Sequence, residues 1–343
     1  MQVIRCRVDP SAWSCADIRT AALVLAVAAA AALSLLVGGT PLRFGDVAAQ
    51  LFHPHGTGVV NTIVWQLRLP RVCIAATVGA SLALCGAMLQ GMLRNPLVDP
   101  YLTGVSAAAA AAVAIAILFG IAAPATPAIG FLAGLGAALL VAALARRGGG
   151  LDGNRLILAG VSLSTLFAAI VTLALVRARS NDYAGAIVAW LAGSMAGRGW
   201  HDLAITAPYV AIGVALAAAA IGPLNALRIG DLRARAVGVD VERAQWIILA
   251  GSSLLAASSV VLAGLVGFIG LLVPHLGRRL VGSDARALLP ASAAIGATLC
   301  MVADAICRRI VAPAELPIGV LLALIGVPAF LYLYLRPSVR GVP

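Results

Sequence analysis

Residues 68–93 read RLPRVCIAATVGASLALCGAMLQGML, and from Val72 to Leu93 this stretch contains no charged side chain. A helix needs roughly 20 mostly apolar residues to cross the hydrocarbon core of a bilayer. The run exceeds that length, and Arg94 follows directly after it. The sequence therefore predicts a membrane-spanning helix over residues 66–92.

The composition of the 343-residue chain extends this interpretation to the whole molecule. Hydrophobic residues make up 62% of it, charged residues 11%, and the mean hydropathy is +1.03, which excludes an ordinary soluble domain. Nine further apolar runs follow the same pattern, so the predicted fold class is an all-α polytopic membrane protein with about ten transmembrane helices. The other expected spans are 20–37, 101–120, 127–145, 155–176, 202–222, 245–265, 267–281, 287–307 and 316–335.

The run at 267–281 is unlike the others because it begins Gly-Phe-Ile-Gly-Leu-Leu-Val-Pro-His-Leu-Gly. Helix breakers at membrane depth survive only where protein or a cavity surrounds the backbone. We expect this segment to be internal.

The first run could be a secretory signal, because it is rich in Ala. Nineteen residues precede it and its apolar stretch is longer than a signal core, which favours a retained helix. The predicted organisation is a cytoplasmic segment over 1–19, one membrane domain over 20–336 and a tail over 337–343.

All 24 basic residues are Arg, and their distribution favours cytoplasmic termini. With the termini inside, 16 Arg fall on the cytoplasmic side and 8 outside, as the positive-inside rule requires. The net charge of +11 would also suit nucleic acid, but the Arg residues are scattered between apolar runs and form no stripe. We therefore expect no nucleic-acid partner.

The residue types restrict the chemistry. Without Lys the chain has no P-loop and forms no Schiff base, so it is not itself an ATPase. The six Cys and four His have no metal-ligand spacing, and no catalytic residue is predicted. A proton-coupled carrier is the alternative, since such carriers rely on intramembrane carboxylates and Asp304 lies in a predicted span. A membrane enzyme is the third alternative.

Two polar features remain open at this stage. Arg68, Arg71, Arg308 and Arg309 lie at predicted outer helix ends, either as snorkelling side chains, as an i,i+4 pair of Asp304 with Arg308, or as a surface for an acidic partner. Residues 224–239 predict one or two short amphipathic helices in a cytoplasmic loop. This segment either lies on the lipid surface or contacts a cytoplasmic partner.

The motifs together resemble the FecCD-type permease subunits of importers for iron chelates, haem and cobalamin. The first half carries Arg68-Leu-Pro-Arg71, Gly79-Ala-Ser-Leu-Ala-Leu-Cys-Gly86, Arg94-Asn-Pro-Leu-Val-Asp-Pro100 and Gly104-Val-Ser106. The second half carries Leu224-Asn-Ala-Leu, Gly230-Asp231, Gly267-Phe-Ile-Gly-Leu-Leu-Val-Pro-His275, Ala303-Asp304 and Glu315-Leu-Pro-Ile-Gly319. The resemblance extends from Trp65 to Arg336.

The resemblance implies the type II ABC importer permease fold and a set of partners in a bacterial inner membrane. The chain would form a homodimer with the pathway at its interface, bind two cytoplasmic ABC ATPase subunits that carry ATP and Mg, and receive a periplasmic binding protein. The chain itself would hold no cofactor.

The resemblance also implies site residues. Arg68, Arg71 and Arg308 would contact the binding protein. The ATPase-coupling residues would be Leu224, Arg228, Gly230, Asp231, Arg235 and Gly238. The cytoplasmic gate would lie at Asn95, Leu97, Gly153 and Asn154, although Gly153 has no side chain to contribute.

The substrate is expected to be a metal chelate. Haem is favoured over a siderophore or cobalamin because the predicted outer loop carries His53-Pro-His55, and imidazole can contact haem iron.

Overall fold

The computed structural model describes residues 15–335, except 39, 41, 55, 57, 122–124, 147–149, 179 and 312–313. Within this part of the chain the regular elements are helices, with one isolated β-bridge between Arg146 and Leu151. The helices of the first half are α1 (Cys15–Leu36), α2 (Phe44–Leu51), α3 (Val59–Thr62), the π-helical η1 (Ile63–Arg68), α4 (Leu69–Leu93), the 3-10 turn η2 (Pro100–Thr103), α5 (Val105–Leu118) and α6 (Thr126–Ala145). The second half contains α7 (Gly153–Val176), α8 (Asn181–Ala192), α9 (Trp200–Ala219), α10 (Ile221–Leu227), α11 (Asp231–Ala236), α12 (Val241–Ala263), α13 (Ile269–Val281), α14 (Ala285–Ile310) and α15 (Ile318–Leu335).

The predicted all-α membrane fold is confirmed, and each of the ten predicted spans contains a helix. In the described residues seven helices are long and apolar enough to cross a membrane, and α5 and α15 are shorter apolar helices. The first long helix begins before α4, because α3 and η1 continue into it to give an uninterrupted run from Val59 to Leu93.

Two predicted boundaries differ from the structure for local reasons. The span expected over 101–120 begins only at Val105, because Gly104 adopts a left-handed φ of 76° that separates η2 from α5. The span expected over 202–222 is divided at Ala220, where α9 ends and α10 begins. The amphipathic segment consequently starts three residues before the predicted Leu224, at Ile221, and it contains two short helices.

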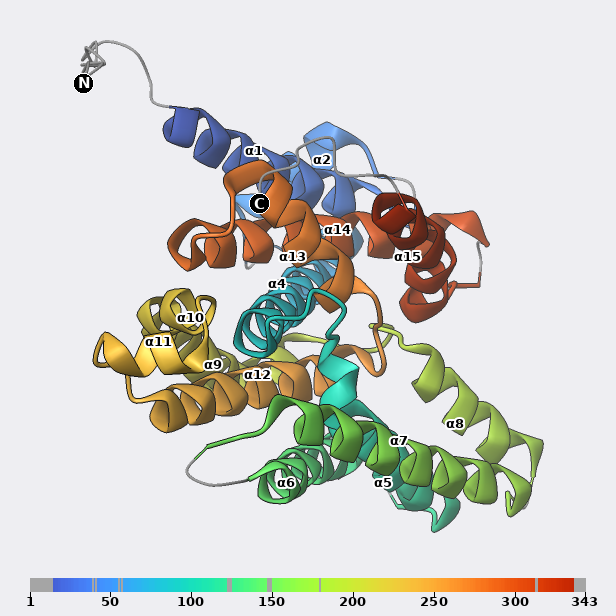
Figure 1. Cartoon of the computed structure of the whole chain (residues 1–343). Coiled ribbons are helices and arrows are strands. Elements are labelled where there is room, and N and C mark those ends of the chain that lie inside the picture. The colour runs from blue at the N-terminus through green and yellow to red at the C-terminus, as the bar shows by residue number, and fades with distance from the viewer. Residues whose placement is uncertain are drawn as a thin grey trace.

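Helix α4 is the centre of the bundle. Of its most apolar residues 78% are buried, as in α12, whereas only 17% are buried in α7 and in α9. Side chains of α4 belong both to the core cluster shared with α12 and to the one shared with α13 and α14. Figure 1 shows α4 and α12 between a group formed by α1, α13, α14 and α15 and a group formed by α5, α6, α7 and α8.

Glycine permits the close contact between α4 and α14. A Cβ added at Gly79 would overlap the carbonyl oxygen of Gly296, and one at Gly296 would overlap the carbonyl oxygen of Gly79. Small residues let helix backbones approach closely, which is a main source of packing energy where lipid removes the hydrophobic drive.

Three of the few acidic residues cap the N-termini of long helices. Asp152, Asp240 and Asp284 each precede a long helix and accept a hydrogen bond from a backbone N–H of its first turn, in α7, α12 and α14 respectively. Such caps satisfy amide donors that a helix start leaves unpaired. All three lie at the end of the bundle that carries α10 and α11, which we call the α11 end. The opposite end, where α1 finishes and α2 begins, is the α2 end.

Candidate functional site

A cluster of charged side chains closes the α2 end between α4 and α14. Arg71 of α4 contacts Asp304 of α14 at 2.9 Å and Glu315 at 2.9 Å. Arg308 also contacts Asp304, with its Nε 3.1 Å from a carboxylate oxygen. The i,i+4 pair of Asp304 with Arg308, one of the alternatives left open by the sequence, is therefore confirmed.

Arg68, the remaining arginine predicted for docking, binds backbone carbonyl oxygens. Arg68 donates from Nη1 to the carbonyl oxygens of Leu35 and Leu36 at 2.6 and 2.9 Å, and from Nη2 to that of Thr40. Arg308 donates to the carbonyl and hydroxyl oxygens of Ser34 at 2.8 and 2.7 Å. Both residues are only 5% exposed. Their hydrogen bonds hold the end of α1 in place.

A cavity of about 430 Å³ opens beside this cluster. Its lining includes four arginines and one glutamate, which are Arg68, Arg71, Arg198, Arg308 and Glu315. Arg198 is paired with Asp202 at 3.1 Å, outside the lining. The cavity has a positive excess and would favour acidic groups. The docking role of Arg68, Arg71 and Arg308 stays a prediction.

The α10–α11 segment combines a buried anchor with exposed apolar side chains. Leu224 is 2% exposed and Leu227 is fully buried, whereas Ile229, Leu232 and Val237 are 52%, 85% and 65% exposed. Sequence reasoning selected Leu224, Arg228, Gly230, Asp231, Arg235 and Gly238 and missed those three exposed side chains. The sequence signal for them is an apolar residue beside charged ones in a short loop helix, as Leu232 is between Asp231 and Arg233.

Polar contacts fasten this segment to the start of α14. The Asn225 amide donates to Asp284 at 2.8 Å and accepts from the backbone N–H of Ala285 at 2.9 Å. Arg228 donates to the carbonyl oxygen of Ser283. Asp231 pairs with Arg94 at 3.3 Å, which connects α11 to the end of α4. These contacts connect the segment to the start of α14 and to the end of α4.

Gly153, in one half of the predicted gate, lies next to Leu93, two residues before Asn95 of the other half. A Cβ at Gly153 would be 3.0 Å from the Leu93 side chain at the end of α4, so Gly153 leaves room for that contact. Asn95 follows Arg94, which is left-handed with φ 52°, and its side chain accepts from the Leu97 N–H at 2.9 Å. Asn154 is exposed on α7. The start of α7 therefore lies beside the end of α4. The gating role of Asn95, Leu97, Gly153 and Asn154 stays a prediction.

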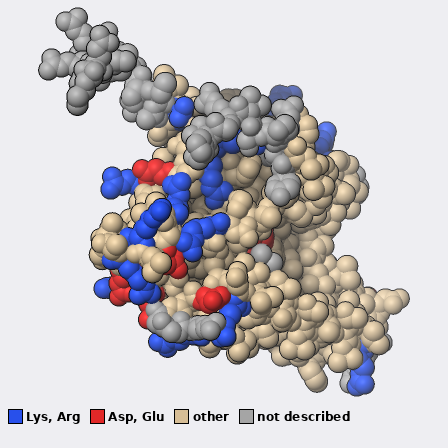
Figure 2. Space-filling model, viewed as in Figure 1, with Lys and Arg blue, Asp and Glu red and all other residues tan. Residues whose placement is uncertain are grey.

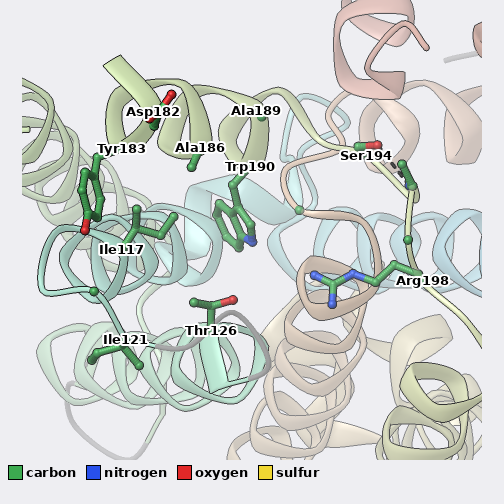
Figure 3. A pocket seen from close by; sticks show the side chains of 14 residues that line it. Ile117, Ile121, Thr126, Asp182, Tyr183, Ala186, Ala189, Trp190, Ser194 and Arg198 are labelled. Carbon is green, nitrogen blue, oxygen red and sulfur yellow. Dashed lines mark hydrogen bonds between the residues drawn. The ribbon is translucent and has the colours of Figure 1, made fainter. Parts of the chain in front are cut away.

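A second cavity, of about 610 Å³, lies under α8, a helix that the sequence analysis missed because twelve residues are too few to span a membrane. Figure 3 shows Trp190 pointing from α8 into this cavity, with Tyr183 and Asp182 on the same helix. Ile117 and Thr126 of α5 and α6 form the facing wall. The mixture of aromatic, apolar and polar walls suits a large organic ligand.

His53 follows α2 and is exposed, with its Nδ1 2.9 Å from the Ala49 carbonyl oxygen. His55 lies outside the described residues. Three or more metal-ligating side chains do not gather anywhere in the described part of the chain.

Charged side chains are unevenly distributed over the surface. In Figure 2 basic and acidic groups concentrate over α10, α11 and the neighbouring helix ends, while the rest of this face is mostly uncharged. An uneven distribution of Arg between the two ends is typical of a membrane protein.

Comparison with known proteins identifies the family. A model of the FecCD transport family matches residues 24–336. The cobalamin import system permease protein BtuC of Halobacterium salinarum is 38% identical over 319 residues, which cover 91% of this chain and 84% of that protein. The Fe(3+) dicitrate transport system permease protein FecC of Escherichia coli is 37% identical over 300 residues, covering 86% and 90%.

A solved structure agrees with the sequence relatives. It is described as an inward-facing conformation of a metal-chelate type ABC transporter, is 34% identical, and superposes with a TM-score of 0.83 over 92% of this chain and 98% of its own. The chain is therefore a multi-pass membrane permease that belongs to the FecCD transport family.

Proposed function

We propose that two copies of this chain form the transmembrane pathway of an ATP-driven, binding-protein-dependent importer of a metal chelate in the bacterial inner membrane, with both termini in the cytoplasm. The observation that carries the proposal is the α10–α11 segment. Its exposed Ile229, Leu232 and Val237 form an apolar surface at the charged end of the molecule. Exposed apolar groups within a polar rim mark protein interaction sites.

The occupant of that surface is proposed to be an ABC ATPase that holds ATP and Mg, one for each permease copy. The chain lacks the Lys of a P-loop, so hydrolysis has to occur on a partner. The contacts of Asn225 and Arg228 with residues 283–285 would transmit movement of the ATPase to α14.

The homodimer interface is proposed to lie along α7. Its exposed face carries Asn154, Thr165 and Thr172, spaced by about two or three helical turns so that they share one face. Thr165 and Thr172 donate to the carbonyl oxygens four residues earlier at 3.0 Å each. Polar side chains in a span usually face other protein or water instead of lipid, which favours a pathway between two copies.

The binding protein is proposed to dock at the α2 end, over the positive cavity beside Arg71. Acidic groups on that protein would be steered there by charge, because complementary potentials raise association rates and fix register. Arg71 is the accessible member, with 13% of its side chain exposed.

The substrate proposal is haem, within the wider class of metal chelates. His53 supports it, because its Nδ1 contact to Ala49 leaves the other ring nitrogen as the group that can face a metal. The relatives named above transport cobalamin and ferric dicitrate, so both compounds belong in the test.

The experiment is uptake into proteoliposomes that contain this chain, its ATPase and its binding protein. Haem, ferric dicitrate and cobalamin are offered in turn, with ATP or a non-hydrolysable analogue inside. We expect concentrative uptake of one ligand with ATP only, and loss of haem uptake in His53→Ala. Uptake that follows a proton gradient and ignores ATP would assign the chain to the secondary carriers.

A further inference from the structure

A cavity of about 390 Å³ with a basic lining lies at the α11 end, next to the apolar surface assigned to the ATPase, and it includes Arg228 of the proposed coupling segment. It forms where the end of α4, the last turns of α13 and the loop before α14 meet beside α10. The lining residues are Gln90, Gly91, Arg94, Asn95, Pro96, Arg228, His275, Arg278, Arg279, Ser283 and Leu288. Four are arginines and one is histidine, and none of these residues is acidic.

One of these guanidiniums is clamped in position. Arg278 Nη2 donates to the Gln90 side-chain oxygen at 2.7 Å, and Gln90 is 2% exposed. The Gln90 amide in turn donates to the carbonyl oxygens of Val98 and Gly270 at 3.1 Å each. This chain of contacts fixes the Arg278 side chain in the wall.

The Arg278 guanidinium also has a donor nitrogen without a hydrogen-bond acceptor among the described residues. In the described part of the chain Arg278 Nη1 is buried without a hydrogen-bond partner, and so is His275 Nε2. A buried charged donor without an acceptor costs more than an ordinary lost hydrogen bond. An acceptor that enters the cavity would offset this cost.

The neighbouring charges leave a positive excess. The lining carries four guanidiniums and, among its described residues, no carboxylate. Two carboxylates lie next to it: Asp231 pairs with Arg94 at 3.3 Å, and Asp284 lies close enough to Arg228 to interact with its charge. Asp284, on the same loop, accepts from Asn225 and from the backbone of Arg286. The cavity therefore attracts an anion with several acceptor oxygens.

We propose that this cavity binds a phosphate group. Guanidiniums match phosphate oxygens in pairs, and charge-assisted bonds of this kind are about twice as strong as neutral ones. Basic pockets between transmembrane helices near a membrane surface characteristically take lipid head groups. The phosphate belongs either to an anionic phospholipid or to a soluble phosphate compound.

The site has a consequence for the neighbouring helices. A phosphate that contacts Arg94 competes with Asp231 for the same guanidinium, and a phosphate on Arg228 lies next to its Ser283 contact. Binding would thus weaken the Arg94–Asp231 contact that connects α11 to the end of α4. This inference concerns the free chain and does not depend on the transported substrate.

The test is thermal unfolding of the full chain in nanodiscs. One arm uses phosphatidylcholine alone and adds inorganic phosphate, with chloride at equal ionic strength as reference. The other arm replaces part of the lipid by phosphatidylglycerol and adds no phosphate. We expect the unfolding temperature to rise in at least one arm: a rise with inorganic phosphate identifies a soluble source, and a rise with phosphatidylglycerol alone identifies a head group.

Matched variants locate the effect. Arg279→Gln and Arg228→Gln remove a charge from the lining without touching Gln90, and each should weaken the half-effective ligand concentration or lipid fraction about tenfold, equivalent to ~1.4 kcal/mol. Arg243→Gln, an exposed α12 arginine outside the lining, should leave the response unchanged. No response in either arm, or the same response in all three variants as in the wild type, would overturn the proposal.

Discussion

Arg71 of α4 binds Asp304 of α14 through both Nε and Nη2, with the closest contact at 2.9 Å and only 2% of the Asp304 side chain exposed. Arg308 contacts the same carboxylate one helical turn away. Burying the carboxylate of Asp304 costs desolvation free energy, and its attraction to the two guanidiniums offsets this cost only while all three groups are present. The pair therefore joins the two long helices at the α2 end.

Asp304→Asn should destabilise the protein strongly, because two largely buried guanidiniums lose their shared counter-charge. Breaking a buried pair from one side costs about 3 kcal/mol or more. Chemical denaturation in detergent, followed by Trp fluorescence, measures the difference. Asp182→Asn, an exposed carboxylate of α8, should change stability little. Equal effects of the two substitutions would contradict a structural role for Asp304.

Glu315→Gln should strengthen docking of an acidic binding protein. Glu315 is the exposed partner of Arg71, and its removal leaves Arg71 with more uncompensated charge towards the cavity. We expect tighter binding at low salt and a smaller gain at high salt, because salt screens exposed charges. Surface plasmon resonance at two salt concentrations measures this.

Asp46→Asn provides the control for the docking prediction, since it removes one exposed negative charge near the α2 end without touching Arg71. If both variants bind the partner equally, Arg71 has no specific part in docking.

Gly79→Ala should destabilise the packing of α4 on α14. The added Cβ meets the Gly296 backbone, which has no flexible end that can move aside. Overpacking of this kind costs about 1–3 kcal/mol. Gly136→Ala in α6 is the matched change, because nothing lies within 4 Å of its added Cβ. It should be neutral or slightly stabilising in the same unfolding measurement, and a reversed order would contradict the observed helix contact.

Leu232→Asp should abolish co-purification of the ATPase while the permease stays folded. The side chain is 85% exposed, so it contributes little to the core but much to an apolar interface. Phe52→Asp, which is 84% exposed and lies after α2 at the opposite end, should leave co-purification intact. Retention of the ATPase by Leu232→Asp would place its docking surface elsewhere.

The lowered pKa of Asp284 predicts that the stability of the protein depends on pH. The backbone N–H of Arg286 and then the Asn225 amide lower the pKa of its carboxyl group. Because the pKa is lower in the folded than in the unfolded chain, this stabilisation is complete above the unfolded value of about 3.9 and is lost as pH falls through the folded value.

The measurement for this prediction is the unfolding temperature of the wild type minus that of Asp284→Ala across pH. The difference should be positive at neutral pH and should shrink below about pH 4. Asn225→Ala should flatten the profile, because it removes one of the hydrogen bonds that lower the pKa of Asp284. A difference that is constant down to strong acid would contradict the titration.

The sequence was sufficient for the helical membrane fold and the order of its helices, because run length against bilayer thickness is a strong signal that needs no tertiary information. In the described residues seven helices are long and apolar enough to cross a membrane, and α5 and α15 are shorter apolar helices. The Asp304–Arg308 pair was one of three alternatives that the sequence left open, and the structure shows it between two residues of one helix. The contact of Arg71 with Asp304 was not predictable in this way. It joins residues 233 positions apart, and only the packing of α4 on α14 brings them together.

The short elements were the weaker part of the prediction. Helix α8 has no length signal, and the exposure of Leu232 depends on how α11 sits against α12. The residues predicted for docking carry charge, yet the structure ties Arg68 and Arg308 into backbone contacts that no pattern in the sequence indicates.

Helix α14 spans 26 residues, or about 39 Å at 1.5 Å per residue, and it is fastened at both ends. Its first turn is tied to Asn225, and its last turns hold Arg71 through Asp304. Helix α14 thus connects the two faces of the membrane. A force applied to α10 would be transmitted along this one helix to the Arg71–Asp304 ion pair. Pro290 has no backbone N–H, so one hydrogen bond near the start of α14 is missing, and the helix can bend at that turn.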